Sequence, residues 1–283
     1  MMQRRLVSFA NSAVAIESDG ARAQAIINFL LGDTSMDDRI TPHVTFRLTQ
    51  NESGNLALYR DDGLMLTSSD DAQIAEFLLG EVSFHLADKS RGGLVFHAGA
   101  LAWQGQGVLV AGGIGAGKTT LTAWLVSRGL DYLTDEMVFV PNDSDTLNAF
   151  VRPLNLKLPS HPVLKPYFDF EAHAQSIYHA PSADLIPPSV LRPSNVLNTP
   201  HLRLMLFPQY TPHIDFEYQA LSKAQTGLAL MQTCLNARNL PEQALTQIAR
   251  LAQIAPAYRL RYSSLDQIPA LIQSLLQKMV TVL

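Results

Sequence analysis

The order of apolar and polar positions in the first 90 residues predicts a small α+β unit. Residues 5–18 and 43–69 alternate roughly between apolar and polar side chains, which is typical of short strands joined by turns. Residues 70–88 follow an acidic start that suits a helix N-terminus, and they place apolar side chains at helical spacing, namely Ile74, Phe77, Leu78, Val82 and Leu86. We therefore expect residues 1–90 to form a meander of short strands and a helix.

The pattern of apolar and polar residues changes at residue 91, and it predicts an α/β unit over residues 91–283. Two short apolar runs, 94–103 and 107–113, flank a turn rich in glycine and glutamine and indicate a hairpin of buried strands. Residues 118–129 have the apolar spacing of a helix, and residues 131–140 are typical of the next strand. Because strand, loop, helix and strand form one βαβ unit, we expect a parallel or mixed sheet.

Residues 159–200 are rich in proline and predict a long connecting segment that is functional or mobile. Beyond this segment, strand and helix patterns alternate again to the end of the chain. They predict a strand at 201–210, helices at 223–238 and 241–254, a strand at 257–263, and a closing helix at 264–279 that Pro269 should bend or shorten.

Gly112 and Gly117-Lys118-Thr119 match the pattern G-x-x-x-x-G-K-[ST] of a phosphate-binding loop. Glycines let backbone N–H groups turn towards phosphate oxygens, and the helix that begins near Lys118 adds the positive end of its dipole. Lys118 would neutralise the β- and γ-phosphates, and the Thr119 hydroxyl is a hard oxygen ligand for Mg²⁺. The alternative is a glycine-rich turn that binds nothing, and the strand before the loop and the helix after it disfavour it. We therefore predict ATP and Mg²⁺ as cofactors, with contacts to the nucleotide from Gly112, Gly113, Ile114, Gly115, Ala116, Gly117, Lys118, Thr119 and Thr120.

The stretch "FHAGALAWQGQGVLVAGGIGAGKTTLTAWLVSRGLDYLTDEMVFV" resembles the core of the HPr kinase/phosphorylase family, and more closely the HPr-kinase-related proteins of uncertain substrate. That family carries a histidine on the strand before the loop and an acidic pair one helix after it, and His97 and Asp135-Glu136 match these places. The similarity covers about residues 94–158 and continues more faintly in later segments. It implies the mixed P-loop sheet that HPr kinase C-terminal domains share with phosphoenolpyruvate carboxykinases, and an enzyme that transfers phosphate to a hydroxyl.

The resemblance also implies catalytic roles around the loop, beside that of Lys118. His97 would lie near the γ-phosphate or orient an acid, and Asp135 would order Mg²⁺. HPr kinases have an aspartate as catalytic base where this chain has Glu136, so the base is either Asp135 or Glu136. Arg152 and Lys157 stand where the family has a loop with a Mg²⁺-binding glutamate, and either could stabilise charge in the transition state. The acceptor HPr and the reverse phosphorolysis therefore stay open.

Each of these residues has a purely structural alternative. His97 could be a buried, hydrogen-bonded imidazole, and the acidic pair could be a solvated strand end. Asn236 and Arg238 lie at the end of a predicted helix, where arginine usually satisfies carbonyl groups or solvent, and Cys234 is expected to be a packed thiol. Four histidines lack metal-ligand spacing and are assigned no site: His161, His173, His179 and His201.

Composition narrows the partners and the compartment. A net charge of −4 without a run of lysine or arginine argues against nucleic acid as a partner. A single cysteine excludes a disulfide framework and a cysteine-rich metal site, and it fits a reducing cytoplasm. No run approaches the roughly 18 apolar residues that a membrane span needs, so we expect a cytoplasmic protein without membrane contact.

The sequence therefore predicts an ATP- and Mg²⁺-dependent kinase that phosphorylates a Ser or Thr hydroxyl of a small protein or peptide. Two alternatives remain. One is a kinase of the same fold that acts on a small molecule, such as serine or a sugar. The other is a regulatory module in which ATP orders residues 159–200 for a partner. Because HPr kinases assemble as oligomers, the resemblance also raises a homo-oligomer, although no residue pattern indicates one.

Overall fold

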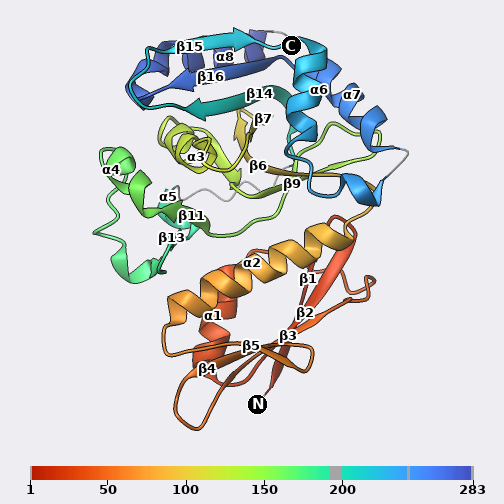
Figure 1. Cartoon of the computed structure of the whole chain (residues 1–283), viewed down its shortest axis with the longest axis vertical. Helices are drawn as coiled ribbons and strands as arrows, with labels where there is room; N and C mark the ends of the chain where they lie inside the picture. The colour runs from red at the N-terminus through yellow and green to blue at the C-terminus, as the bar shows by residue number, and fades with distance from the viewer. Residues whose placement is uncertain (1, 192–198, 241–242, 282–283) are drawn as a thin grey trace.

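The computed structural model describes residues 2–191, 199–240 and 243–281, and its helices and three sheets form a mixed α/β protein (Figure 1). The N-terminus lies at one end of the longest axis and the C-terminus at the other. Among the described residues, no helix combines the length and the apolar character needed to cross a bilayer. The expected class, α/β with a mixed sheet, is confirmed at this level.

The first sheet holds its five strands in sequence order, and the expected strands in residues 5–18 and 43–69 are present. Neighbouring strands are antiparallel except β2 and β3, which are parallel because helix α1 crosses between them. Helix α1 was not predicted, since its N-cap Gly20 offers no side-chain hydrogen bond and its first turn has no acidic residue. The elements are β1 (Gln3–Phe9), β2 (Ser12–Ser18), α1 (Ala21–Leu31), β3 (Thr45–Gln50), β4 (Leu56–Arg60) and β5 (Gly63–Ser68).

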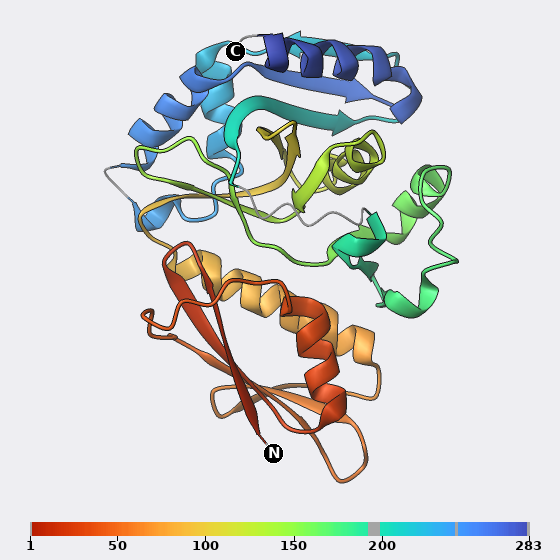
Figure 2. The same cartoon turned by 180° about the vertical axis from the view of Figure 1, so that it is seen from behind.

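Helix α2 (Asp71–Lys89) is the predicted helix, and it runs between the first sheet and the rest of the chain (Figures 1 and 2). Its N-cap Asp70 accepts hydrogen bonds from the N–H groups of Ala72 and Gln73. Four of the five expected apolar positions are buried, whereas Phe77 is 37% exposed. The core beneath α2 also contains residues from far along the chain, including Val95, Met137, Phe139 and Phe150. The first 90 residues therefore share a core with the large sheet.

The large sheet is mixed and has eight strands, in the order β10-β9-β6-β7-β14-β16-β15 with β8 also paired to β6. Strands β7, β14 and β16 are parallel, whereas the other pairs are antiparallel, including the predicted hairpin of β6 and β7. The elements are β6 (Gly93–Trp103), β7 (Gln106–Ala111), α3 (Lys118–Ser127), β8 (Asp131–Thr134), β9 (Met137–Pro141), β10 (Asn148–Ala149), β14 (His201–Tyr210), β15 (Glu217–Ala220) and β16 (Ala257–Tyr262).

The strand expected at residues 131–140 is interrupted at Asp135 and Glu136, which separate β8 from β9. Both flanks still pair with β6, and Thr134 lies opposite Ala100 and Met137 opposite His97. The register shifts by one residue within β8, between Ala100 and Leu101 of β6. Within the break, the N–H of Ala98 donates to the carbonyl oxygen of Glu136 at 3.0 Å. The acidic pair therefore occupies an irregular point inside a paired strand, instead of a free strand end.

The helix predicted at 223–238 ends early, at Met231, because the chain then pairs with β6. The N–H of His97 donates to the carbonyl oxygen of Thr233 at 2.8 Å, and Asn236 bonds the main chain of β6 through both ends of its side-chain amide. Pro269 is the first residue of the closing helix, so it shortens the helix expected from residue 264 and does not bend it. The helix expected at 241–254 begins at Ala244, and residues 241 and 242 lie outside the described residues. The helices are α6 (Lys223–Met231), α7 (Ala244–Ile254) and α8 (Pro269–Thr281).

Residues 159–200 were predicted as a long loop, but much of this segment has regular structure; residues 192–198 lie outside the described part. Its strands form a three-stranded sheet with β11, and its apolar residues pack into the cluster that also contains Trp124 of α3. These elements were not predicted because each strand or helix spans only two to four residues, too few to show a period among the prolines. The elements are β11 (Leu154–Lys157), α4 (His161–Leu164), β12 (Tyr178–His179), β13 (Ala183–Ile186) and α5 (Pro188–Leu191), with 3₁₀ turns at Leu158–Ser160 and Ala174–Ser176 and, elsewhere in the chain, at Ala237–Asn239 and Leu265–Gln267.

We expect Asn236 to be a stability residue. Its fully buried side chain accepts from the N–H of Val95 and donates to the carbonyl oxygen of Gly93. Asn236→Ala leaves both groups without a partner and should lower the free energy of unfolding by about 2–4 kcal/mol in urea titrations. The control is Arg238→Ala, which removes a surface ion pair with Asp88 and should cost less than about 1 kcal/mol. Equal losses in the two variants would contradict this assignment.

Candidate functional site

The loop between β7 and α3 has the backbone of an anion cradle. Gly115 and Gly117 adopt φ values of 76° and 91°, a left-handed conformation that side chains with a Cβ rarely allow. Gly117 is the N-cap of α3, and no side chain caps that helix end. The first-turn N–H groups and the positive end of the helix dipole are therefore not engaged by a capping side chain, and they suit a bound phosphate.

The two sides of the loop differ. On the inner side, the carbonyl oxygen of Ala116 accepts from the N–H of Tyr210 at 3.1 Å, and a Cβ on Gly117 would lie 3.3 Å from the hydroxyl of Tyr262. The ends of β14 and β16 therefore support the loop from below. On the outer side, a Cβ on Gly113 or Gly115 would meet no atom within 4 Å. These residues fit a bound polyphosphate because the open side carries the glycines.

Some of the residues predicted to contact the nucleotide could do so only through their backbone. The side chain of Ile114 is 88% exposed, so this residue presents only its backbone to the loop. Thr119 lies partly exposed in the first turn of α3. The neighbouring hydroxyl of Thr120 donates to the hydroxyl of Ser160 at 2.9 Å, which ties α3 to the segment after β11. Thr119 is therefore the threonine suited to a metal ion.

Lys118 is held within the loop. Its side chain is buried, and Nζ donates to the carbonyl oxygens of Gly112 at 2.9 Å and Gly113 at 3.1 Å. Burial lowers the pKa of Lys118, whereas the charges of Glu136 and Asp135 raise it. The ammonium group thus lies where the loop would meet a phosphate, with two carboxylates near enough to influence it.

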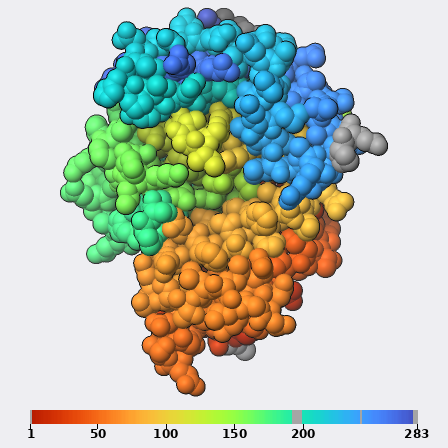
Figure 3. Space-filling model, viewed as in Figure 1, coloured from red at the N-terminus to blue at the C-terminus, as the bar shows by residue number. Residues whose placement is uncertain are grey.

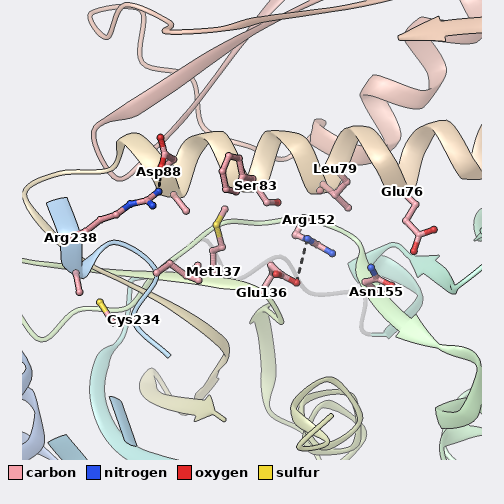
Figure 4. Close-up of a pocket in the computed structure, with 15 residues that line it drawn as sticks. Glu76, Leu79, Ser83, Asp88, Glu136, Met137, Arg152, Asn155, Cys234 and Arg238 are labelled. Carbon is pink, nitrogen blue, oxygen red and sulfur yellow. Dashed lines mark hydrogen bonds and ion pairs between the residues drawn. The ribbon is translucent and has the colours of Figure 1, made fainter. Parts of the chain in front are cut away.

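Glu136 forms the centre of a charged cluster. Its Oε1 lies 3.6 Å from Nε2 of His97, and its Oε2 lies 3.6 Å from Nη1 of Arg152 (Figure 4). The Arg152 side chain is only 3% exposed, whereas that of Glu136 is 31% exposed. Burial lowers the pKa of His97, although the charge of Glu136 opposes this shift. The structure therefore brings three of the predicted catalytic residues together around one accessible carboxylate.

Asp135 differs from its neighbour because it is buried and already hydrogen-bonded. Its Oδ1 accepts from the hydroxyl of Tyr132 at 3.2 Å, and its Oδ2 accepts from the N–H of Asn155 at 3.3 Å. Burial raises the pKa of Asp135, and the charge of Arg152 opposes this. Sequence reasoning missed both Tyr132 and Asn155, because only the fold buries Asp135 against them. Of the two acids, Glu136 is the one that solvent reaches.

Arg152 and Lys157 do not lie on the same regular strand. Arg152 precedes β11, which begins at Leu154, and its Nε donates to the carbonyl oxygen of Pro153 at 3.2 Å. Lys157 is exposed at the end of β11, yet its charge lowers the pKa of both His97 and Lys118. Both cations therefore act on the same region.

Two of the histidines assigned no site have a structural partner. Asp184 contacts Nε2 of His161 at 3.1 Å and Nδ1 of His179 at 3.0 Å, which joins the short helix α4 to the three-stranded sheet. Over residues 2–191, 199–240 and 243–281, no group of three or more histidine, cysteine, aspartate or glutamate side chains is placed to hold a metal ion.

Comparisons with known proteins show a distant likeness to solved structures. No family model matches the chain, and no curated protein matches it. Among solved structures, the chain is similar to the Hpr(Ser) kinase/phosphatase from Coxiella burnetii, with 14% sequence identity and a TM-score of 0.32. The alignment covers 65% of this chain and 94% of that chain. The relationship is a distant one at the level of the fold.

We expect the His97 imidazole to titrate below its ordinary value of 6.5, because burial disfavours the charged form. It is then uncharged at neutral pH. Glu136→Gln should lower this pKa further, since the negative charge of Glu136 raises it. Imidazole NMR signals, assigned with His97→Gln, measure both values. A midpoint at or above 6.5, or one that Glu136→Gln leaves in place, would contradict the placement of these two side chains.

Proposed function

We propose that this protein is an ATP- and Mg²⁺-dependent kinase that transfers the γ-phosphate to a Ser or Thr hydroxyl of a small protein or peptide. The observation that carries the proposal is the position of Glu136. Its carboxylate is partly exposed and held between His97 and Arg152, close enough to raise the pKa of Lys118 in the phosphate loop. A base placed beside an anion cradle is the arrangement that phosphoryl transfer requires.

The loop would bind and orient the polyphosphate. The uncapped N–H groups of α3 and the Lys118 ammonium would contact the β- and γ-phosphates. Arg152, which pairs with Glu136, and Lys157, whose charge lowers the pKa of His97 and Lys118, would add positive charge nearby. The site contains three cationic side chains, of Lys118, Arg152 and Lys157, and only the two carboxylates of the acidic pair. Its positive charge would therefore attract a polyanion. Mg²⁺, when bound, would neutralise charge on the β- and γ-oxygens, and the Thr119 hydroxyl and Asp135, through water, are the residues suited to hold it.

In the transfer itself, the acceptor oxygen forms a bond to the γ-phosphorus. The bond from that phosphorus to the bridging oxygen breaks, and ADP leaves with the electron pair. Glu136 accepts the hydroxyl proton, and Arg152 holds its carboxylate in place. His97, uncharged at neutral pH, can hydrogen-bond the same carboxylate without adding a competing positive charge. Asp135 is buried and accepts the N–H of Asn155, so it would act on the metal only through water.

Lys118→Ala should weaken Mg-ATP binding by about 10- to 100-fold, because it removes a charge-assisted contact to phosphate. Isothermal calorimetry with a non-hydrolysable ATP analogue measures the change. The matched control is Lys165→Ala, which removes the same charge from an exposed ion pair with Glu171. The proposal fails if the wild-type protein binds no nucleotide, or if both variants bind it as well as the wild type.

Substitutions of Glu136 and Asp135 should have different effects on turnover and on Mg-ATP affinity. Glu136→Gln should leave Mg-ATP affinity nearly intact and lower turnover by about 10²–10⁴-fold, because only the proton acceptor is lost. Asp135→Asn should weaken Mg-ATP binding as well if this carboxylate orders the metal. Nucleotide affinity and ADP release give the two readouts. Near-native turnover in both variants would remove the acidic pair from the mechanism.

A further inference from the structure

A cavity of about 650 Å³ lies between helix α2 and the large sheet, and we call it the α2 trough. Figure 3 shows the orange residues of the N-terminal part meeting the later residues along this junction. Figure 4 shows Glu136 and Arg152 facing α2 across the trough, with Asp88 and Arg238 at one end and Glu76 and Asn155 at the other. The proposed catalytic carboxylate is therefore also a wall of this cavity.

We infer that the α2 trough binds the acceptor as an extended peptide segment, with its Ser or Thr hydroxyl at Glu136. This inference rests on the proposed function and adds the place and the form in which the acceptor binds. It also gives the N-terminal part a task, because α2 supplies one whole wall of the trough.

The length of the trough favours a peptide over a small metabolite. The lining residues of α2 extend from Glu76 to Asp88, which is about 18 Å at the rise of an α-helix. An extended chain advances about 3.3 Å per residue, so roughly five residues fill this length. Glu136 lies between the two ends in Figure 4, so a central hydroxyl residue would have neighbours on both sides.

The walls offer both kinds of contact that an extended peptide needs. At the end near Asp88, Phe84 is 58% exposed and Leu235 is 40% exposed, so an apolar side chain of the peptide would be covered there. Ser83 Oγ and Asn155 Oδ1 are buried without a hydrogen-bond partner among the described residues. Both residues line the trough, so main-chain groups of a bound peptide could satisfy them after a change of rotamer.

Gly80 provides a way to block the trough without disturbing the core. It lies on the exposed side of α2 and lines the cavity, and a Cβ placed on it meets no atom within 4 Å. Gly80→Trp would fill the trough, and the loss of a helix-interior glycine should not weaken α2. The matched control is Gln73→Trp, which adds the same bulk at an exposed position of α2 outside the lining.

The probes are synthetic seven-residue peptides with a central serine and alanine elsewhere, in which one leucine is moved from position to position. Phosphate incorporation from labelled ATP is measured together with Mg-ATP affinity. We expect leucine on one side of the serine to raise incorporation by about tenfold, and Phe84→Asp to remove this preference. Gly80→Trp should lower incorporation into every peptide by about tenfold or more, with nucleotide affinity kept, whereas Gln73→Trp should behave as the wild type.

Each other outcome is decisive. Incorporation by Gly80→Trp at the wild-type rate, or a leucine preference that survives Phe84→Asp, would overturn the trough as the acceptor site. If no peptide is labelled while free serine or a sugar accelerates ADP release from the wild-type protein, the acceptor is a small molecule and the peptide is excluded. If no probe is labelled and no metabolite accelerates ADP release, the inference is likewise rejected. Failure of the wild-type protein to bind Mg-ATP would instead reject the proposed function itself.

Discussion

The pairing of strand β6 on both of its edges is the constraint on which the rest of the structure depends. One edge pairs with β8 and β9 on either side of the acidic break, and the other pairs with β7 and then with residues 233–236. Because β7 leads directly into the phosphate loop, this one strand places the loop, His97 and Glu136 relative to one another. The site is thus assembled around the paired edges of one strand.

The electrostatics of the site follow from unequal burial of similar groups. Asp135 and Glu136 are adjacent in the chain, but the break between β8 and β9 buries one carboxylate and leaves the other within reach of solvent. Buried Arg152 compensates both acids, and Lys118 is buried against carbonyl oxygens of its own loop. Charges that would be costly alone are therefore kept in the interior as a mutually neutralising group.

Local signals predicted the local parts of this molecule. The hairpin before the loop, the helix after it and helix α2 all carry period, turn or capping signals in a few neighbouring residues, so the sequence sufficed. Helix α1 lacks such signals, and the strands in residues 154–186 are too short to show a period. The early end of α6 depends on β6, about 140 residues away, which no local pattern records.

The same limit applies to the site. The motif gave the loop residues, and the family resemblance gave His97 and the acidic pair, but the different surroundings of the two acids come from Tyr132, Arg152 and Asn155. These residues stand on separate strands and loops, and their meeting is a property of the assembled sheet. The cavity beside α2 could not be predicted either, because one of its walls comes from residues before the predicted domain boundary and the other from residues after it.

The core shared by α2 and the large sheet bears on how a substrate reaches Glu136. A hinge that swung the two lobes apart would expose Val95, Met137, Phe139 and Phe150 to water, and so would oppose its own opening. Two parts of a protein that share a continuous apolar core can move past each other only by small shear displacements. A chain bound beside α2 would therefore have to enter without parting α2 from the sheet, which a loose or unfolded tail can do more readily than a folded surface.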